Sequence, residues 1–158
     1  MVIEDQPAWA PHLRSRSVVR NAAKRHFVDP SLAAAALGAT HQRLVKDLEL
    51  FGFLYESLVI RDLRVYAQAT GASVFQYRDN TGLEIDAVIE ATDGRWFAAE
   101  VKLGAANIDE AAANLLRFAQ RVDTTKSGEP SALAVVVATG FGYVREDGVV
   151  IPAQAGIQ

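Results

Sequence analysis

The chain has 158 residues, the usual size of one domain, and half of them are apolar, enough to bury a hydrophobic core. It contains no cysteine, which excludes disulfide bonds and thiolate metal sites and is typical of a reducing cytoplasm. No apolar run approaches the roughly 18 residues that span a membrane, the N-terminus does not resemble a secretory signal, and the net charge of −3 argues against strong non-specific DNA binding. We therefore expect a cytoplasmic protein that does not contact membranes.

The first part of the chain differs in charge from the rest. Residues 1–23 contain two prolines and no hydrophobic periodicity, so we expect an irregular arm. Five basic side chains and no acidic one occur between residues 6 and 28, whereas the remainder of the chain is acidic. A basic arm on an acidic body suits a segment that contacts phosphate groups. It suits equally well a segment that packs on an acidic partner domain.

A strand and two helices are expected next. Residues 24–28 favour a short strand, residues 32–37 a short helix, and residues 40–71 a long helix with an apolar stripe. Glu56 lies beside this stripe, one turn after Gly52, whose small size leaves space above the carboxylate. An ordinary solvated helix position is an equally good interpretation of Glu56.

The second half of the chain alternates strands with one further helix. The expected elements are a strand at 73–78, a hairpin at 84–102, an Ala-rich helix at 107–122, a buried strand at 132–138 and a final hairpin at 143–151. Residues 152–158 read as a disordered tail. We therefore expect one mixed α/β domain over residues 24–151.

The hairpin at 84–102 brings acidic side chains together. A three-residue loop at 92–94 with glycine in third place sets the register, so Asp86 falls opposite Glu100. In the same register Glu84 falls opposite Lys102. Two facing carboxylates destabilise a sheet unless a positive charge lies between them, and a divalent cation is a natural candidate. Each residue alone fits an exposed strand position, but together they favour a metal site.

These residues resemble a known nuclease signature. Asp86 followed by the Glu-Val-Lys of residues 100–102 is similar to the motif of the PD-(D/E)XK, or restriction-endonuclease-like, superfamily, with Ile85 in place of its proline. The resemblance implies an α-β-β-β-α-β core, in which helices flank a mixed central sheet. It also implies that Asp86, Glu100 and the additional acid Glu56 bind Mg²⁺ or Mn²⁺. Lys102 would position the attacking water.

A narrower resemblance extends from about residue 3 to residue 151. Four segments look like the C-terminal domain of a bacterial family of AAA+-type ATP-binding proteins, a largely uncharacterised domain thought to be nuclease-like: residues 24–30, 52–56, 77–79 and 100–104. The chain has no G-x-x-x-x-G-K-[ST] phosphate loop, so we expect no ATP hydrolysis. A truncated gene product, a dissected domain and a stand-alone protein all fit this pattern.

Two functions remain open. The first is a Mg²⁺-dependent phosphodiesterase that cuts DNA, with Glu56, Asp86, Glu100 and Lys102 at its site. Arg78, before the hairpin, is a candidate phosphate contact. The second is a catalytically inactive nuclease-like module that binds an ATPase domain, another partner or a copy of itself. The acid–acid–lysine set favours the first function, and the acidic body with the missing ATPase half favours the second.

Overall fold

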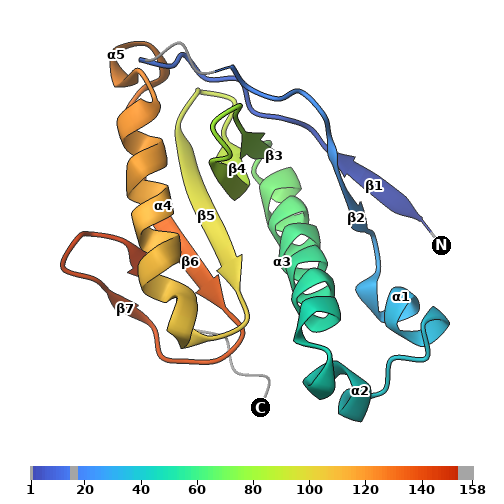
Figure 1. The fold of residues 1–158 in the computed structure, drawn as a ribbon. Coiled ribbons are helices and arrows are strands. Elements are labelled where there is room, and N and C mark those ends of the chain that lie inside the picture. The colour runs from blue at the N-terminus through green and yellow to red at the C-terminus, as the bar shows by residue number, and fades with distance from the viewer. Residues whose placement is uncertain (1, 15–17, 153–158) are drawn as a thin grey trace.

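A mixed sheet between two helices forms the body of the protein. The computed structural model describes residues 2–14 and 18–152, and in this part six strands follow the order β3-β4-β5-β6-β8-β7. Their bounds are β3 Ser73–Arg78, β4 Glu84–Glu90, β5 Trp96–Lys102, β6 Leu133–Val137, β7 Tyr143–Val144 and β8 Val150–Ile151. The first three strands are antiparallel, and β6 lies parallel to both β5 and β8. This arrangement confirms the prediction of one α/β domain with a mixed central sheet and flanking helices (Figure 1).

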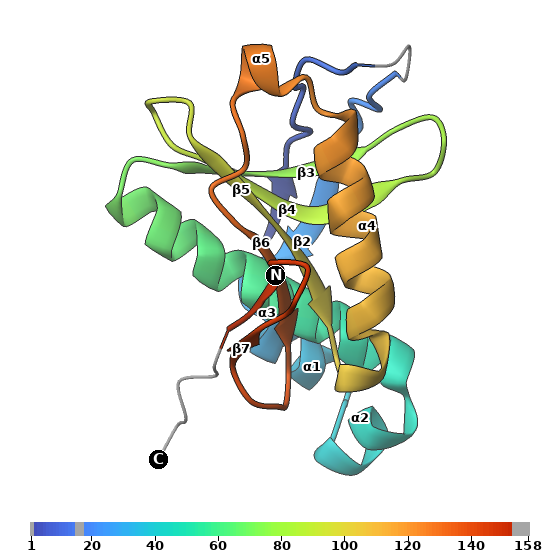
Figure 2. The ribbon, with the colours of Figure 1, turned by 90° about the vertical axis from the view of Figure 1, so that its left-hand side faces the viewer.

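Side chains of alternate residues on β4 and β5 build two cores. Val88 and Ala98 pack beneath α4 (Ile108–Arg121), whereas Ala87 and Ala99 pack against α3 (Leu48–Ala69). Figure 2 shows the two helices on opposite sides of β5. The α4 side is the larger core and contains a cluster of aromatic rings from Trp9, Tyr77, Trp96 and Phe118.

The expected long helix is interrupted near its start. Asp47 has φ −117° and ψ 79°, which ends α2 (His41–Lys46), and its side chain accepts a hydrogen bond from the Leu50 N–H at the start of α3. A capping aspartate therefore divides the predicted helix into two. The short helix before it is α1 (Pro30–Ala36). The chain after β5 forms a short 3₁₀ turn (Ala105–Asn107), and after α4 it forms α5 (Thr124–Ser127). None of the helices in the described ranges has the length and apolarity that a membrane crossing requires.

The N-terminal arm contributes to the fold more than its sequence predicts. Strand β1 (Ile3–Gln6) pairs antiparallel with β2 (Lys24–Phe27), although an irregular segment was expected at β1. Four residues with only one buried side chain give no usable alternation, so this strand depends on its partner. The arm then crosses the sheet toward α5 (Figure 1). The ring of the buried Trp9 is tilted by 44° against that of Trp96, with the ring centroids 4.8 Å apart. The last part of the predicted tail, residues 153–158, lies outside the described residues.

Candidate active site

The predicted hairpin register is the one observed between β4 and β5. Ala87 pairs with Ala99 and Glu90 with Trp96, and Gly94 has the positive φ of +83° that the three-residue loop requires. The paired ladder ends at Ala87. The next residues in the same register are Asp86 and Glu100, and both line one cavity.

A bulge in β4 turns Asp86 out of the regular ladder. Gln76 of β3 lies opposite two residues of β4, Asp86 and Ala87, because the register shifts between Phe75 and Tyr77. Bulges of this kind re-aim a side chain and often occur beside active sites. The bulge lies where the two carboxylates meet.

Hydrogen bonds from two strands, β5 and β1, hold Asp86 in the bulge. Its Oδ2 accepts a hydrogen bond from the Val101 N–H at 2.8 Å. Its main-chain carbonyl accepts one from Gln6 Nε2 at 2.9 Å, and the same amide group donates to the Phe75 carbonyl, also at 2.9 Å. Gln6 is completely buried. Strand β1 therefore stabilises the backbone that the bulge leaves unpaired.

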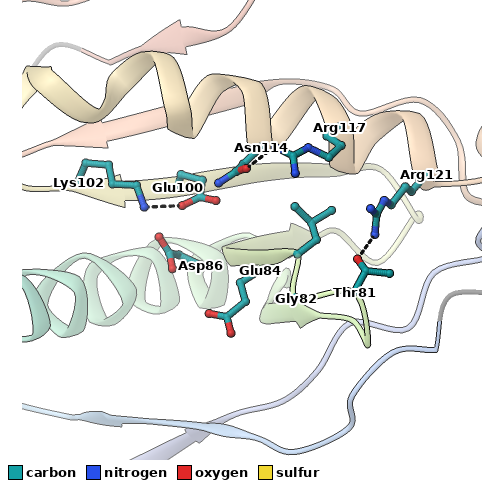
Figure 3. A pocket seen from close by; sticks show the side chains of 10 residues that line it. Thr81, Gly82, Glu84, Asp86, Glu100, Lys102, Asn114, Arg117 and Arg121 are labelled. Carbon is teal, nitrogen blue, oxygen red and sulfur yellow. Dashed lines mark hydrogen bonds and ion pairs between the residues drawn. The ribbon is translucent and has the colours of Figure 1, made fainter.

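Glu100 is a buried carboxylate beside another carboxylate. It is only 3% exposed, and its Oε2 lies 2.9 Å from Lys102 Nζ (Figure 3). Burial and then the charge of Asp86 raise the pKa of Glu100 to about 8, although Lys102 opposes this shift. A hydrogen bond between the two carboxyl groups contributes in the same direction. Glu100 therefore binds a proton more readily than an ordinary glutamate does when no divalent cation is bound.

Lys24 connects Glu56 to the site. Its ammonium group forms an ion pair with Glu56 Oε1 and lies 3.6 Å from Asp86 Oδ1. Burial and then repulsion from Asp86 raise the pKa of Glu56, while Lys24 opposes this shift. Burial by itself would lower the pKa of Lys24, but its attraction to Glu56 and Asp86 outweighs burial and raises it. The sequence places Lys24 only in a basic stretch, and its inward direction comes from the pairing of β1 with β2.

The pairing predicted for Glu84 is wrong. Glu84 does not reach Lys102 but forms an ion pair with Arg78, with Nε and Oε1 2.7 Å apart. The bulge and the end of the ladder change which side chains lie across from each other at this point. Arg78 lines a small cavity together with Asp86, but Glu84 already neutralises its charge. Its contact with phosphate stays a prediction.

Opposite the carboxylates, α4 contributes basic residues that the sequence did not single out. The cavity has a volume of about 360 Å³, with Asp86, Glu100 and Lys102 on the strand side and Arg117 on the helix side (Figure 3). Arg117 donates a hydrogen bond to Asn114 Oδ1 and forms no ion pair within the described residues. The spacing of residues 114, 117 and 121 on one helix face was the available signal.

The donor atoms fit a hard divalent cation that keeps some of its waters. Mg²⁺ is usually bound through one or two carboxylates plus substrate phosphate oxygens, and Asp86 with Glu100 supplies such a pair. Within residues 2–14 and 18–152, no group of three or more histidine, cysteine, aspartate or glutamate side chains is arranged to hold a metal by itself. The role of Glu56 as a third metal ligand stays a prediction.

Comparison with known proteins identifies a family but no activity. The family model described as "Domain of unknown function (DUF4143)" matches residues 51–155, a segment that includes Glu56, Asp86, Glu100 and Lys102. Neither a curated protein nor a solved structure matches the chain. Because the family model covers well over half of the 158 residues, the chain belongs to the DUF4143 family.

Proposed function

We propose that the chain is a Mg²⁺- or Mn²⁺-dependent phosphodiesterase that cuts DNA, with an active site of the PD-(D/E)XK kind. The observation that supports this proposal best is the cavity in which Asp86, Glu100 and Lys102 face Arg117. The cavity offers two carboxylates for a cation, a lysine beside them and, opposite, a guanidinium that forms no ion pair in the described part of the chain. These are the groups that a phosphodiester and its developing charge require. The sequence also resembles a nuclease-like domain of AAA+-type proteins, which agrees with a phosphodiesterase.

Each side chain has a separate part in the proposed reaction. Asp86 and Glu100 would hold the cation, which when bound polarises the phosphoryl group and acidifies a water molecule. Arg117 is placed to donate hydrogen bonds to phosphate oxygens from the other wall of the cavity. These contacts fix the phosphate between the strands and α4.

Lys102 acts as a charged donor in this scheme. Burial alone would lower its pKa, but the charge of Glu100 and the hydrogen bond to it, with the charge of Asp86, together raise it. The amine is therefore protonated at neutral pH. In that state it orients a water molecule and stabilises negative charge on the phosphate, and it does not itself remove a proton.

Glu56 has an auxiliary part. Its carboxylate holds the Lys24 ammonium next to Asp86, which offsets the crowding of negative charge before a cation binds. To reach the cation as a ligand, Glu56 would have to release Lys24. Replacing Glu56 by glutamine should therefore weaken the reaction less than replacing Asp86 or Glu100.

Nicking of supercoiled plasmid in Mg²⁺ or Mn²⁺ tests the proposal. We expect the wild type to nick DNA and Lys102→Ala to lose about 10²- to 10³-fold in rate, the usual effect of removing one group that stabilises developing charge. Lys126→Ala removes an exposed lysine on α5 and should retain full activity. Equal nicking by the wild type and Lys102→Ala would identify a contaminant. No nicking by the wild type in either metal would refute the proposal.

The second candidate function is an inactive module for protein association. It is favoured by the two lysines, Lys24 and Lys102, which already offset the carboxylates without any metal. DUF4143 domains are also often found with AAA ATPases, which makes such an ATPase the expected partner. If the wild type neither nicks DNA nor responds to Mn²⁺, this function is the one the structure supports.

A further inference from the structure

A second and larger cavity adjoins the carboxylates. It has a volume of about 820 Å³ and lies between the N-terminal half of α3 and the segment that follows β5. We call it the α3 groove, defined by Phe51, Phe53 and Tyr55 of α3 together with Leu103, Asn107 and Thr139. Its volume falls within the range of about 300–1,000 Å³ that is usual for ligand pockets.

Lys102 connects the α3 groove to the proposed active site. Its side chain lines both the groove and the cavity that contains Asp86 and Glu100. Glu56 also lines the groove. A ligand with an anionic group held at Lys102 can therefore extend directly into the groove.

The inside of the groove is apolar and aromatic, and its rim is polar. Phe53 lines the groove and is 58% exposed, so its ring is accessible to a ligand. Asn107 and Thr139 supply hydrogen-bonding groups at the rim. Gly104 also lines the groove, and a Cβ added there would meet no atom within 4 Å. The lining of the groove thus combines an apolar, aromatic surface with three charged residues, Glu49, Glu56 and Lys102.

We propose that the α3 groove binds an unstacked nucleobase of the strand whose phosphate lies at Lys102, so that the substrate is single-stranded or locally unpaired nucleic acid. The proposal rests on the function proposed above. A nucleotide has an anionic end, which the proposed cation and Lys102 would hold, and a flat aromatic end, which matches the phenyl rings of the groove. A base within a duplex is stacked on its neighbours and does not present its face. An apolar protein segment would match the interior of the groove but would supply no group for the proposed cation site, which Lys102 borders.

The exposed aromatic residues of α3 provide a matched pair of variants. Phe53→Ala removes an aromatic ring from the groove, whereas Tyr66→Ala removes a ring that is 68% exposed on the same helix outside it. Binding is measured by fluorescence anisotropy with a labelled single-stranded oligonucleotide and with the corresponding duplex. Ca²⁺ replaces Mg²⁺ so that binding is measured without cleavage. It takes similar oxygen ligands but prefers a different coordination geometry.

We expect Phe53→Ala to weaken single-strand binding by about 5- to 150-fold, the range that corresponds to the stacking of one base on an aromatic side chain. Binding to the duplex should change by less than about 2-fold, and Tyr66→Ala should match the wild type on both ligands. Equal single-strand affinity of the wild type and Phe53→Ala would refute the groove assignment. If the wild type still nicks plasmid in that case, the proposed function stands and only the nucleobase site is wrong.

Sedimentation of the same variants tests whether a second copy of the chain, and not a nucleobase, occupies the groove. If the wild type forms a dimer that Phe53→Ala dissociates while single-strand binding is unaffected, a second copy covers the groove and the proposal is wrong. If the wild type binds neither oligonucleotide and nicks no plasmid, the proposed function and the nucleobase site both fail. A monomer with the expected loss of single-strand affinity supports the proposal.

Discussion

Two buried carboxylates, Asp79 and Glu100, have opposite pKa shifts in this protein. Asp79 is fully buried, and burial alone would raise its pKa, yet hydrogen bonds from Thr81, Tyr77 and the Leu83 N–H lower it. Glu100 is almost as buried, but its neighbours are one lysine and a second carboxylate, so its pKa is raised to about 8. Burial by itself therefore does not mark a functional site.

The difference lies in how completely the charge is satisfied. Arg121 forms an ion pair with Asp79, and the surrounding donors fix the turn that leads into β4. These contacts make Asp79 a structural residue that stabilises the fold. Glu100 and Asp86, by contrast, crowd negative charge into a cavity, and such crowding destabilises the fold until a cation or proton relieves it. Carboxylates held in this way are candidates for function.

The largest effect that this comparison predicts is on Asp79. Asp79→Ala should lower the free energy of unfolding by about 3 kcal/mol or more, because it leaves Arg121 and several buried donors without their partner. Urea denaturation measures the change. Asp93→Ala, at an exposed hairpin turn, serves as the control and should change stability by much less. If Asp79→Ala lowers the free energy of unfolding no more than Asp93→Ala does, Asp79 has no structural role of this kind.

Acid should destabilise the protein through His26. Burial and then the charges of Lys24 and Arg64 lower the pKa of His26 from 6.5 to about 4. The unfolded state therefore binds more protons between these values, so His26 contributes stability above pH 6.5 that is lost as the pH falls toward 4. The loss is about 3 kcal/mol at most. Urea denaturation of the wild type and His26→Gln at several pH values measures it, and identical pH profiles would contradict the assignment.

Gln6 should affect the site through the bulge. Gln6→Leu removes the donor to the Phe75 and Asp86 carbonyls and the acceptor for His26, whose Nε2 lies 2.8 Å from Gln6 Oε1. Each buried polar group left without a partner costs about 1–3 kcal/mol, although a water molecule that replaces the amide would reduce the loss. Gln68→Leu, on the exposed surface of α3, is the control for chemical denaturation. Equal stability of the two variants would show that β1 does not support the bulge.

Among these substitutions, Glu100→Gln should change stability least, and it should raise stability where the others lower it. The substitution removes one of two crowded charges, so the stability of the metal-free protein should stay equal or rise by up to about 1 kcal/mol. Thermal melting in EDTA measures this change. A clear loss of stability would mean that the ion pair with Lys102 stabilises the fold more than the repulsion destabilises it.

Local patterns predicted the hairpin, whereas distant contacts determine the rest of the site. The glycine of the 92–94 loop and strict alternation are enough to set the register of Asp86 and Glu100. The roles of Gln6 and Lys24 depend on β1 and β2, which lie about 80 and 60 residues before Asp86 in the sequence and pair through main-chain bonds that have no sequence signature. Arg117 was missed for a different reason, because the spacing along α4 does not show that this helix face lies opposite Asp86 and Glu100.

The bulge and the helix break show a second kind of limit. Period-two alternation cannot reveal an extra residue in β4, so the partner of Glu84 was assigned wrongly. Asp47 fits a helical position as well as a cap, and only its backbone angles show which it is. The type of a helix or strand was therefore predictable where its hydrophobic pattern is long. The partners of a side chain were predictable only next to a turn of defined type.

Thermal melting in the presence of Mn²⁺ tests most directly whether Asp86 and Glu100 form a cation site. A cation at about 100 times its dissociation constant stabilises the folded state by about 2.7 kcal/mol, so Mn²⁺ should raise the melting temperature of the wild type by several degrees. Asp86→Asn retains an acceptor for the Val101 N–H but should lose most of this increase, and Asp62→Asn on α3 should retain it. An unchanged wild-type melting temperature, or an equal increase in Asp86→Asn, would contradict the account.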